Sequence, residues 1–194
     1  MTVIDPEVVL DAAREVFIAD GGIEVGELAQ TVGVNRTTLY RRWGGRDGLL
    51  AEVIWSITEP TIAAAARRAP GRGAEKIART MGEFAAIVNG SVHFGTFLRR
   101  EPERALRLMT THAGGVQPRI VGKIRELVQA EIDAGEMSSP LPIDDLALIL
   151  VRITETFVYT NLITGREPDA AKASQACAAI LGVGLLSDDP NEIT

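Results

Sequence analysis

Four arginines within twelve residues form the most distinctive chemical pattern in the sequence. Residues 35–46 contain Arg36, Arg41, Arg42 and Arg46 and no acidic side chain. The whole chain has 20 basic and 26 acidic side chains, a net charge of −6, so the rest of the chain carries 16 basic against 26 acidic groups. A positive segment on an acidic protein predicts one local anion-binding face. On charge alone, a solvated surface patch explains the arginines equally well.

Residues that could carry nucleophilic or metal chemistry are few and badly spaced. Ser91 and His93 are two positions apart and cannot face each other on a helix, and Cys177 lies among alanines with no base nearby in the sequence. One cysteine excludes an intrachain disulfide, and the two histidines have no zinc-binding spacing. We therefore expect no catalytic site, no metal and no cofactor, and a small hydrolase is the weakest alternative.

The composition is that of a globular protein with a sizeable core. The chain has 194 residues, of which 46% are hydrophobic and 24% are charged. This length corresponds to one or two domains. The longest apolar run, residues 176–186, is shorter than the roughly 18 residues of a membrane span. The acidic first residues lack the basic start of a secretory signal, so we expect a cytoplasmic protein without a membrane segment.

Helix signals dominate the chain and strand-like alternation is scarce, which predicts an all-α fold. We expect an N-terminal three-helix helix-turn-helix domain over residues 1–45 and a C-terminal helical ligand-binding and dimerisation domain over residues 46–194. The predicted helices cover about 6–20, 25–31, 35–43, 46–68 with a perturbation at Pro60, 74–89, 91–100, 102–112, 117–134, 143–163 and 168–186.

The turn at residues 31–34 predicts a helix-turn-helix, with Gly33 at its bend. Asn35 is a good N-cap for the second helix of this motif. Side chains in the first turn of such a helix meet base edges in a major groove, whereas others reach phosphates. Leu39 and Trp43 are expected in the core. The predicted DNA-binding residues are Asn35, Arg36, Thr37, Thr38, Tyr40, Arg41, Arg42 and Arg46. A three-helix core in another protein, with solvated arginines, is the alternative.

The residues from Leu28-Ala29 through Gly33-Val34 and Thr38-Leu39-Tyr40 to Trp43 and Arg46 resemble the tetracycline-repressor (TetR) family in order and spacing. The resemblance implies a homodimeric DNA-binding repressor with a helical ligand-binding body. It matches Thr38, Tyr40 and Arg46 to phosphate-contacting positions, and Arg36, Thr37 and Arg42 to variable recognition positions. Glu24 departs from the pattern, because the family usually has Thr or Ser as the cap of the second helix.

The predicted helix 143–163 carries apolar residues on two faces, a pattern typical of a helix packed on both. One face is expected in the protein's own core and the other against a second copy. The last helix is rich in small residues, which permit close helix approach and a four-helix dimer interface. An intrachain buried hairpin is the alternative. The predicted interface residues are Leu148, Val151, Val158, Leu162, Ala173, Ala176 and Ile180.

Polar and aromatic residues within the apolar helices of the body are candidates to bind an effector, since ligand sites are mostly apolar with few polar groups. One set shares a side of the predicted helix 143–163, where Arg152 could instead pair with Glu155. Each of the others could equally be core or surface. The predicted ligand-binding residues are His93, Phe94, Phe97, Arg104, Leu108, Thr111, His112, Gln117, Arg152, Glu155, Thr156 and Tyr159.

The body is also similar to a subgroup of the TetR family named after QsdR, which is associated with lactone catabolism. This similarity rests on residues 97–102 and on the segments Val151-Arg152-Ile153 and Leu162-Ile163-Thr164-Gly165. It implies a small lactone-like or other carbonyl effector. The sequence therefore predicts a ligand-responsive repressor that binds double-stranded DNA with a palindromic operator as a homodimer. A helical protein-interaction adaptor without DNA binding is the main alternative.

Overall fold

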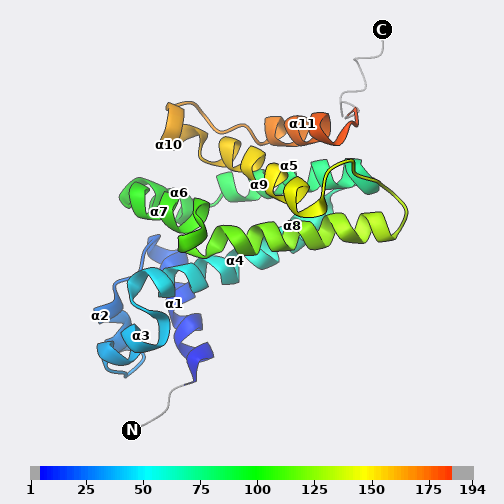
Figure 1. Cartoon of the computed structure of the whole chain (residues 1–194). Coiled ribbons are helices and arrows are strands. Elements are labelled where there is room, and N and C mark those ends of the chain that lie inside the picture. The colour runs from blue at the N-terminus through cyan, green and yellow to red at the C-terminus, as the bar shows by residue number, and fades with distance from the viewer. Residues whose placement is uncertain (1–4, 185–194) are drawn as a thin grey trace. The chain divides into compact units, whose positions relative to one another are not determined.

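The computed structural model describes residues 5–184, and this part of the chain is helical without strands (Figure 1). The helices closely follow the ranges predicted from apolar periodicity, Pro starts and Gly stops. In chain order they are α1 (Pro6–Asp20), α2 (Val25–Thr31), α3 (Arg36–Trp43), α4 (Arg46–Arg68), α5 (Gly73–Asn89), α6 (Val92–Arg100), α7 (Pro102–Thr110), the 3-10 helix η1 (His112–Gly114), α8 (Val116–Asp133), α9 (Ile143–Val158), α10 (Thr160–Thr164) and α11 (Ala170–Leu181).

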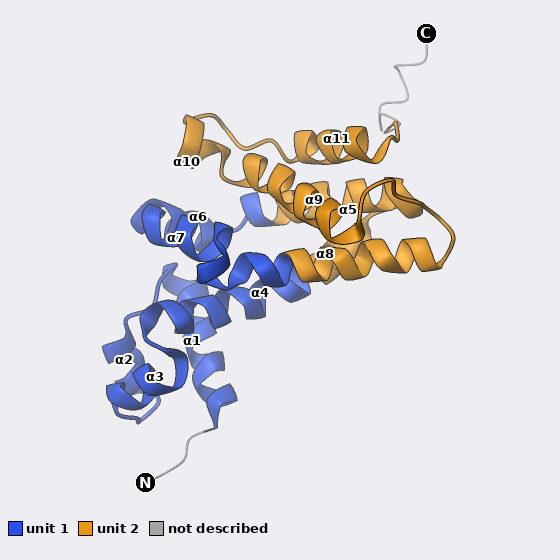
Figure 2. Cartoon of the chain, viewed as in Figure 1, with its two compact units in different colours: residues 1–61, 88–120 blue, residues 62–87, 121–194 orange. Residues whose placement is uncertain are grey.

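The chain divides into two compact units (Figure 2). Unit 1 comprises residues 1–61 and 88–120, and unit 2 comprises residues 62–87 and 121–194. Unit 1 thus contains the predicted DNA-binding segment together with α6, α7 and η1. The functional boundary that the sequence places between residues 45 and 46 stays a prediction.

Local signals set the ends of the first three helices. The side chain of Asp5 accepts a hydrogen bond from the backbone of Glu7, and Asn35 does the same for Thr37, as N-caps do. Gly21 and Gly44 end α1 and α3 with positive φ angles of 67° and 71°. The core of this region buries the inward faces of all three helices. Its main members are Val9, Ala13, Phe17, Leu28, Ala29 and Leu39.

The end of α1 lies directly against α6. The rings of Phe17 and Phe97 pack edge to face with centroids 5.5 Å apart, and Phe17 meets His93 in the same way at 5.8 Å. A Cβ at Gly21 would lie 2.7 Å from the Cβ of Thr96, so only glycine permits this approach. Burial lowers the pKa of His93. The N-terminal helices are therefore packed on an element that is distant in sequence.

Unit 2 is organised around the close packing of α9 against α11. The buried residues Leu150 and Thr154 of α9 meet Cys177 of α11, with the hydroxyl of Thr154 3.8 Å from the sulfur. Elsewhere in this unit, Glu131 of α8 joins the start of α5 through a 2.6 Å ion pair with Lys76 and a hydrogen bond from the backbone of Gly73. The intrachain hairpin weighed from the sequence is thus present.

The predicted helix 143–163 is wrong as one continuous element, because it breaks after Val158. The chain continues after Tyr159 in the short helix α10, and hydroxyls of Thr156, Thr160 and Thr164 each donate to the carbonyl four residues earlier in this region. The last predicted helix, 168–186, is observed as Ala170–Leu181, and residues 185–186 lie outside the described part. By contrast, α4 continues through Pro60.

Helix α4 also bears on the expectation that no segment could span a membrane. It has 23 residues and its most apolar window has a mean hydropathy of 1.3, so by length and composition alone it could cross one. A core helix of a soluble protein passes the same test. The face formed by Leu49, Leu50 and Val53 is buried inside the protein.

Candidate nucleic-acid interface

Helix α3 presents almost all of its side chains to solvent. Leu39 is its one buried residue and anchors it to the core, and Trp43 is only half-buried, less than the core position expected from the sequence. The bend before α3 is made by Gly33, whose φ of 69° favours glycine. The residues predicted to meet DNA from this helix and its cap are all exposed: Asn35, Arg36, Thr37, Thr38, Tyr40, Arg41 and Arg42.

The guanidinium groups of α3 are exposed, and the charge of Glu24 acts on Arg36 without forming an ion pair with it. Arg36, Arg41 and Arg42 form no ion pair within residues 5–184. The guanidinium of Arg36 donates a 2.9 Å hydrogen bond to the hydroxyl of Tyr40 and lies 5.1 Å from the centre of its ring. This contact orients Arg36 without neutralising it. An exposed helix bearing three uncompensated arginines can bind a polyanion.

Arg46 differs from the prediction that it is available to phosphates. Its side chain is only 19% exposed, and its guanidinium binds Glu101 through two hydrogen bonds of 2.6 and 2.7 Å. The Nε atom donates to the carbonyl of Ile23 at 2.6 Å. The Nη2 atom also lies 3.2 Å from a carboxylate oxygen of Glu24. Arg46 is thus held internally at the start of α4. Glu24 makes no side-chain cap to α2 and instead joins this group.

The pair between Arg46 and Glu101 belongs to a larger group, here called the Glu101 cluster: Arg46, Asp47, Glu101, Arg104 and Arg107. Arg104 contacts both carboxylates, and Arg107 donates to Asp47 at 2.5 Å. The hydrogen bond from Arg46 lowers the pKa of Glu101, and hydrogen bonds and charge from Arg107 and Arg104 lower that of Asp47 despite its partial burial. The cluster fixes the first turn of α4 to the junction of α6 and α7.

The sequence reasoning missed Glu101 and Asp47 as functional candidates. Glu101 lies 55 residues from Arg46 along the chain, so no local spacing signals the pair. The only nearby sign is Pro102, which starts α7 and places Glu101 at a helix junction. Charge pairing at this distance requires the tertiary fold.

The effector candidates of unit 1 have structural contacts. Phe97 and Leu108 are core residues, and Arg104 is held in the Glu101 cluster. The hydroxyl of Thr111 accepts a hydrogen bond from Gly114, and Thr111 and His112 are exposed, while Phe94 and Gln117 are half-buried. A role for His93 and these residues in binding an effector stays a prediction.

In unit 2, Arg152 donates a 2.8 Å hydrogen bond to Glu155, the pairing weighed from the sequence. The Glu155 side chain is only 11% exposed, and its Oε1 atom has no hydrogen-bond partner in the described protein. Burial raises the pKa of Glu155 to about 7 and raises that of the fully buried Tyr159 as well. Thr156 is exposed. Glu155 is therefore a candidate in this unit with a buried oxygen atom that is free to form a hydrogen bond with a ligand.

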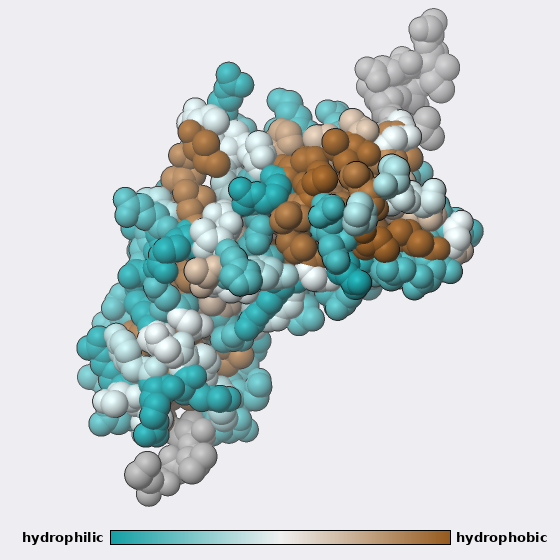
Figure 3. Space-filling view, viewed as in Figure 1, coloured by the Kyte–Doolittle hydropathy of each residue, from teal (hydrophilic) through white to brown (hydrophobic). Residues whose placement is uncertain are grey.

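Three of the predicted dimer residues are in the protein's own core. Val151, Val158 and Ala173 are already buried within the single chain, in which α9 packs against α11. Leu148 and Ile180 are 42% and 50% exposed, and Leu162 and Ala176 are half-buried. In Figure 3 a broad hydrophobic patch lies over unit 2 in the region of α9. The exposed apolar side chains, not the buried ones, are the candidates for contact with a second copy.

Two family models together match most of the chain. The model described as bacterial regulatory proteins, tetR family, matches residues 9–53, and the model described as the tetracyclin repressor-like C-terminal domain matches residues 72–182. No curated protein matches the sequence.

Solved structures share the fold over nearly the whole chain. The R. erythropolis transcriptional repressor QsdR, from the TetR family, is 29% identical with a TM-score of 0.86, covering 94% of this chain and 97% of that one. The Bacillus subtilis transcriptional regulator FadR, in complex with stearoyl-CoA, is 15% identical with a TM-score of 0.57, covering 94% and 100%. The multidrug binding protein EbrR, complexed with imidazole, is 19% identical with a TM-score of 0.57 over 94% of each chain.

Proposed function

The chain belongs to the TetR family of bacterial transcriptional regulators, and we propose that it is a repressor that binds a palindromic operator as a homodimer and releases it when a small effector binds. The observation that carries this proposal is the exposed α3 face, where Arg36, Arg41 and Arg42 form no ion pair within the described residues. Helix-turn-helix dimers place two such helices about one turn of DNA apart, roughly 34 Å. Repressor action is taken from the similarity to QsdR. A regulator of this type acts in the cytoplasm.

The dimer contact is proposed to form on unit 2 through the exposed apolar residues near α9 and α11. Leu148 and Ile180 are large apolar side chains that are about half exposed, and isolated chains rarely expose a wide apolar patch without a partner. The buried Val151, Val158 and Ala173 support the interface from beneath. One Glu placed in this apolar contact is enough to test it, because burying an unpaired carboxylate costs free energy of association.

The effector is proposed to be a small lactone-like or other carbonyl compound, with Glu155 as the residue that reads it. Because its pKa is about 7, Glu155 is protonated in roughly half of the molecules at neutral pH, and its unpartnered Oε1 can then donate to a carbonyl oxygen. An effector shifts DNA affinity only if it binds the two states of the dimer unequally.

Operator binding is tested by selecting bound fragments from random double-stranded DNA and measuring affinity for the recovered sequence. We expect a palindromic site and an affinity that falls steeply with salt. Arg36→Ala is expected to relax sequence preference, because this position lies in the first turn of α3 where base edges are reached. Recovery of no preferred sequence, or no salt dependence, would contradict the proposal.

The dimer is tested by sedimentation of Leu148→Glu and Ile180→Glu variants. Both are expected to yield monomers. Val92→Glu is the matched control, since Val92 is an apolar side chain that is 81% exposed and belongs to unit 1. Dimers that persist in both interface variants would reject this surface.

A further inference from the structure

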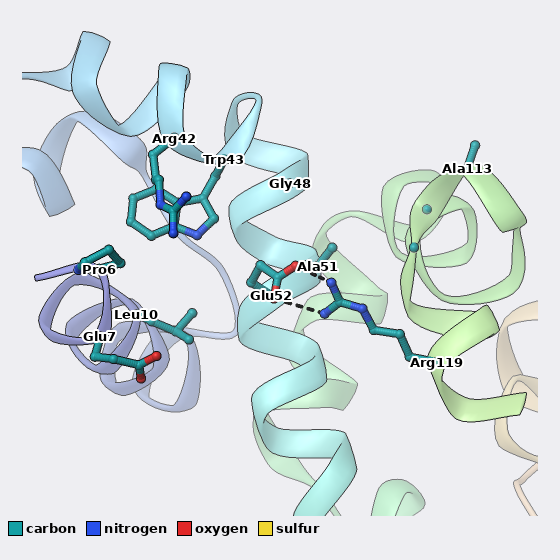
Figure 4. A pocket seen from close by; sticks show the side chains of 12 residues that line it. Pro6, Glu7, Leu10, Arg42, Trp43, Gly48, Ala51, Glu52, Ala113 and Arg119 are labelled. Atoms are coloured by element: carbon teal, nitrogen blue, oxygen red, sulfur yellow. Dashed lines mark hydrogen bonds and ion pairs between the residues drawn. The ribbon is translucent and has the colours of Figure 1, made fainter. Parts of the chain in front are cut away.

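Unit 1 contains a cleft of about 570 Å³, and all the residues that line it belong to this unit. Its walls come from the first turns of α1, the end of α3, the start of α4, and the segment from η1 into α8. Figure 4 shows Arg42 and Trp43 extending from α3 on one side, with Pro6, Glu7 and Leu10 of α1 on another. This volume is within the range of about 300–1,000 Å³ that is typical of small-molecule sites.

Two glycines hold the walls of the cleft in close backbone contact. A Cβ at Gly48 would overlap the carbonyl oxygen of Trp43, and a Cβ at Gly114 would overlap the carbonyls of Arg107 and Leu108. Both glycines line the cleft. Because α3 meets α4 and η1 meets α7 without intervening side chains, the cleft is largely preformed, as binding sites for small ligands usually are.

The charged groups of the cleft fall into a satisfied pair and two free groups. Arg119 and Glu52 form two hydrogen bonds of 3.0 and 2.5 Å, drawn in Figure 4, and neutralise each other. Arg42 and Glu7 have no ion pair in the described part of the chain. The half-buried indole of Trp43 supplies an aromatic surface on the α3 side of the cleft, beside Arg42.

We propose that this cleft is a second small-molecule site, which takes a planar aromatic acid that also carries a hydrogen-bond donor. The ring stacks on Trp43, and the carboxylate accepts two hydrogen bonds from the planar guanidinium of Arg42. The carboxylate of Glu7, which when ionised can only accept, accepts a hydrogen bond from the donor group of the ligand. A ligand with only positive groups would be repelled by Arg42. A ligand with negative groups at both ends would be repelled by Glu7.

Occupation of the cleft acts directly on the DNA-reading helix. The ligand bridges the end of α3 to α1, so it fixes the helix orientation without a signal from unit 2. It also engages Arg42, and so withdraws one cation from DNA. This last consequence, unlike the binding itself, rests on the proposed operator contact of Arg42.

The test is calorimetric titration of the full-length protein, without DNA, with indole-3-carboxylate and its neutral isostere indole-3-carboxamide. We expect one site per chain for the carboxylate and at least about 10-fold weaker binding of the carboxamide, because a charge-assisted hydrogen bond is lost. Arg42→Gln is expected to weaken carboxylate binding by a similar factor. Arg41→Gln, one residue away on α3 and outside the cleft, is the matched control and is expected to bind as the parent does.

Three results would overturn the proposal: no binding of indole-3-carboxylate at millimolar concentration, equal binding of the two probes, or equal binding by the Arg42→Gln and Arg41→Gln variants. Arg42 is exposed, so its replacement is not expected to unfold the protein. Because the titration contains no DNA, its outcome is independent of whether the chain binds an operator.

Discussion

The arginines of α3 and the arginine that opens α4 have opposite electrostatic environments although they are neighbours in the sequence. Arg41 and Arg42 are exposed and unpaired, whereas Arg46 donates to Glu101 and to the carbonyl of Ile23. All four arginines look alike as a charge run. The difference shows that one positive segment can contain both exposed arginines that attract a polyanion and an arginine whose internal ion pair stabilises the position of that surface.

The largest expected effect is on DNA affinity when the free arginines are removed. Replacing Arg41 and Arg42 together by Gln should weaken operator binding by about 100-fold and lower the salt dependence by about two released counterions, because each phosphate contact contributes to that slope. Fluorescence anisotropy across a salt series measures both. An unchanged slope would show that these arginines do not reach phosphates.

The Glu101 cluster is expected to govern stability instead. Glu101→Gln removes the main counter-charge of Arg46, and we expect the free energy of unfolding to fall by about 2 kcal/mol, less than for a fully buried pair because both side chains are about one-fifth exposed. Urea denaturation gives this value. Glu103→Gln is a suitable control, since Glu103 is exposed on the same helix α7 and outside the cluster. Equal free energies of unfolding for the two variants would show that the pair of Glu101 with Arg46 does not stabilise the fold.

The same cluster predicts a pH dependence with a definite sign. Arg46 lowers the pKa of Glu101 below 4.5 in the folded protein, so the folded state favours the ionised form. Its contribution to stability is complete above the unfolded pKa and is lost as pH falls through the lower folded pKa. In Glu101→Gln the loss of stability as pH falls below the unfolded pKa of a glutamate should therefore be smaller. A pH dependence of stability identical to that of the parent would show that the pKa of Glu101 is not lowered in the folded protein.

Glu155 is expected to behave in the opposite way. Its pKa is raised from 4.5 to about 7, so its contribution is present below the unfolded pKa and is lost as pH rises through the folded value. Glu155→Gln, which keeps the shape of the neutral acid, should stabilise the protein by about 1–2 kcal/mol at pH 8 and by little at pH 4.5. Thermal unfolding at both pH values checks this. Stabilisation that is equal at the two values would show that Glu155 is ionised in the fold.

The smallest expected effect concerns the cap of α3. Asn35→Ala removes the 2.9 Å hydrogen bond to the backbone of Thr37 and should cost about 1 kcal/mol. Asn35→Asp is the matched control, because aspartate caps as well as asparagine does. If the alanine variant loses DNA affinity without losing stability, Asn35 acts on DNA and not only on α3.

Much of the fold could be read from local patterns. Asp5-Pro6 and Asn35 marked helix starts, Gly21, Gly33 and Gly44 marked the turns, and apolar spacing placed Leu28, Ala29 and Leu39 in the core. These signals act within one or two helical turns, so they do not depend on the rest of the chain. The TetR family and the all-helical class followed from the same residues; the family models confirm the first, and the helices of residues 5–184 confirm the second.

The assignments that failed depended on partners distant in sequence. Periodicity alone placed Val151 and Val158 on a face for a second copy, but both side chains are already buried within the single chain. The break between α9 and α10 has no local signal of this kind, because threonines with the same bond to the carbonyl four residues earlier lie within the continuous helix α4. The position of a helix face relative to other helices is set by packing, which no single helix encodes.

The sequence by itself determined the helices, the turn that presents α3 and the concentration of positive charge there, because caps, glycines and side-chain charges act locally. Only the tertiary structure decided which cations are free. Glu101 reaches Arg46 because α6 and α7 fold back onto the start of α4, and a charge is neutralised by whatever carboxylate lies within a few ångströms, whatever its distance along the chain.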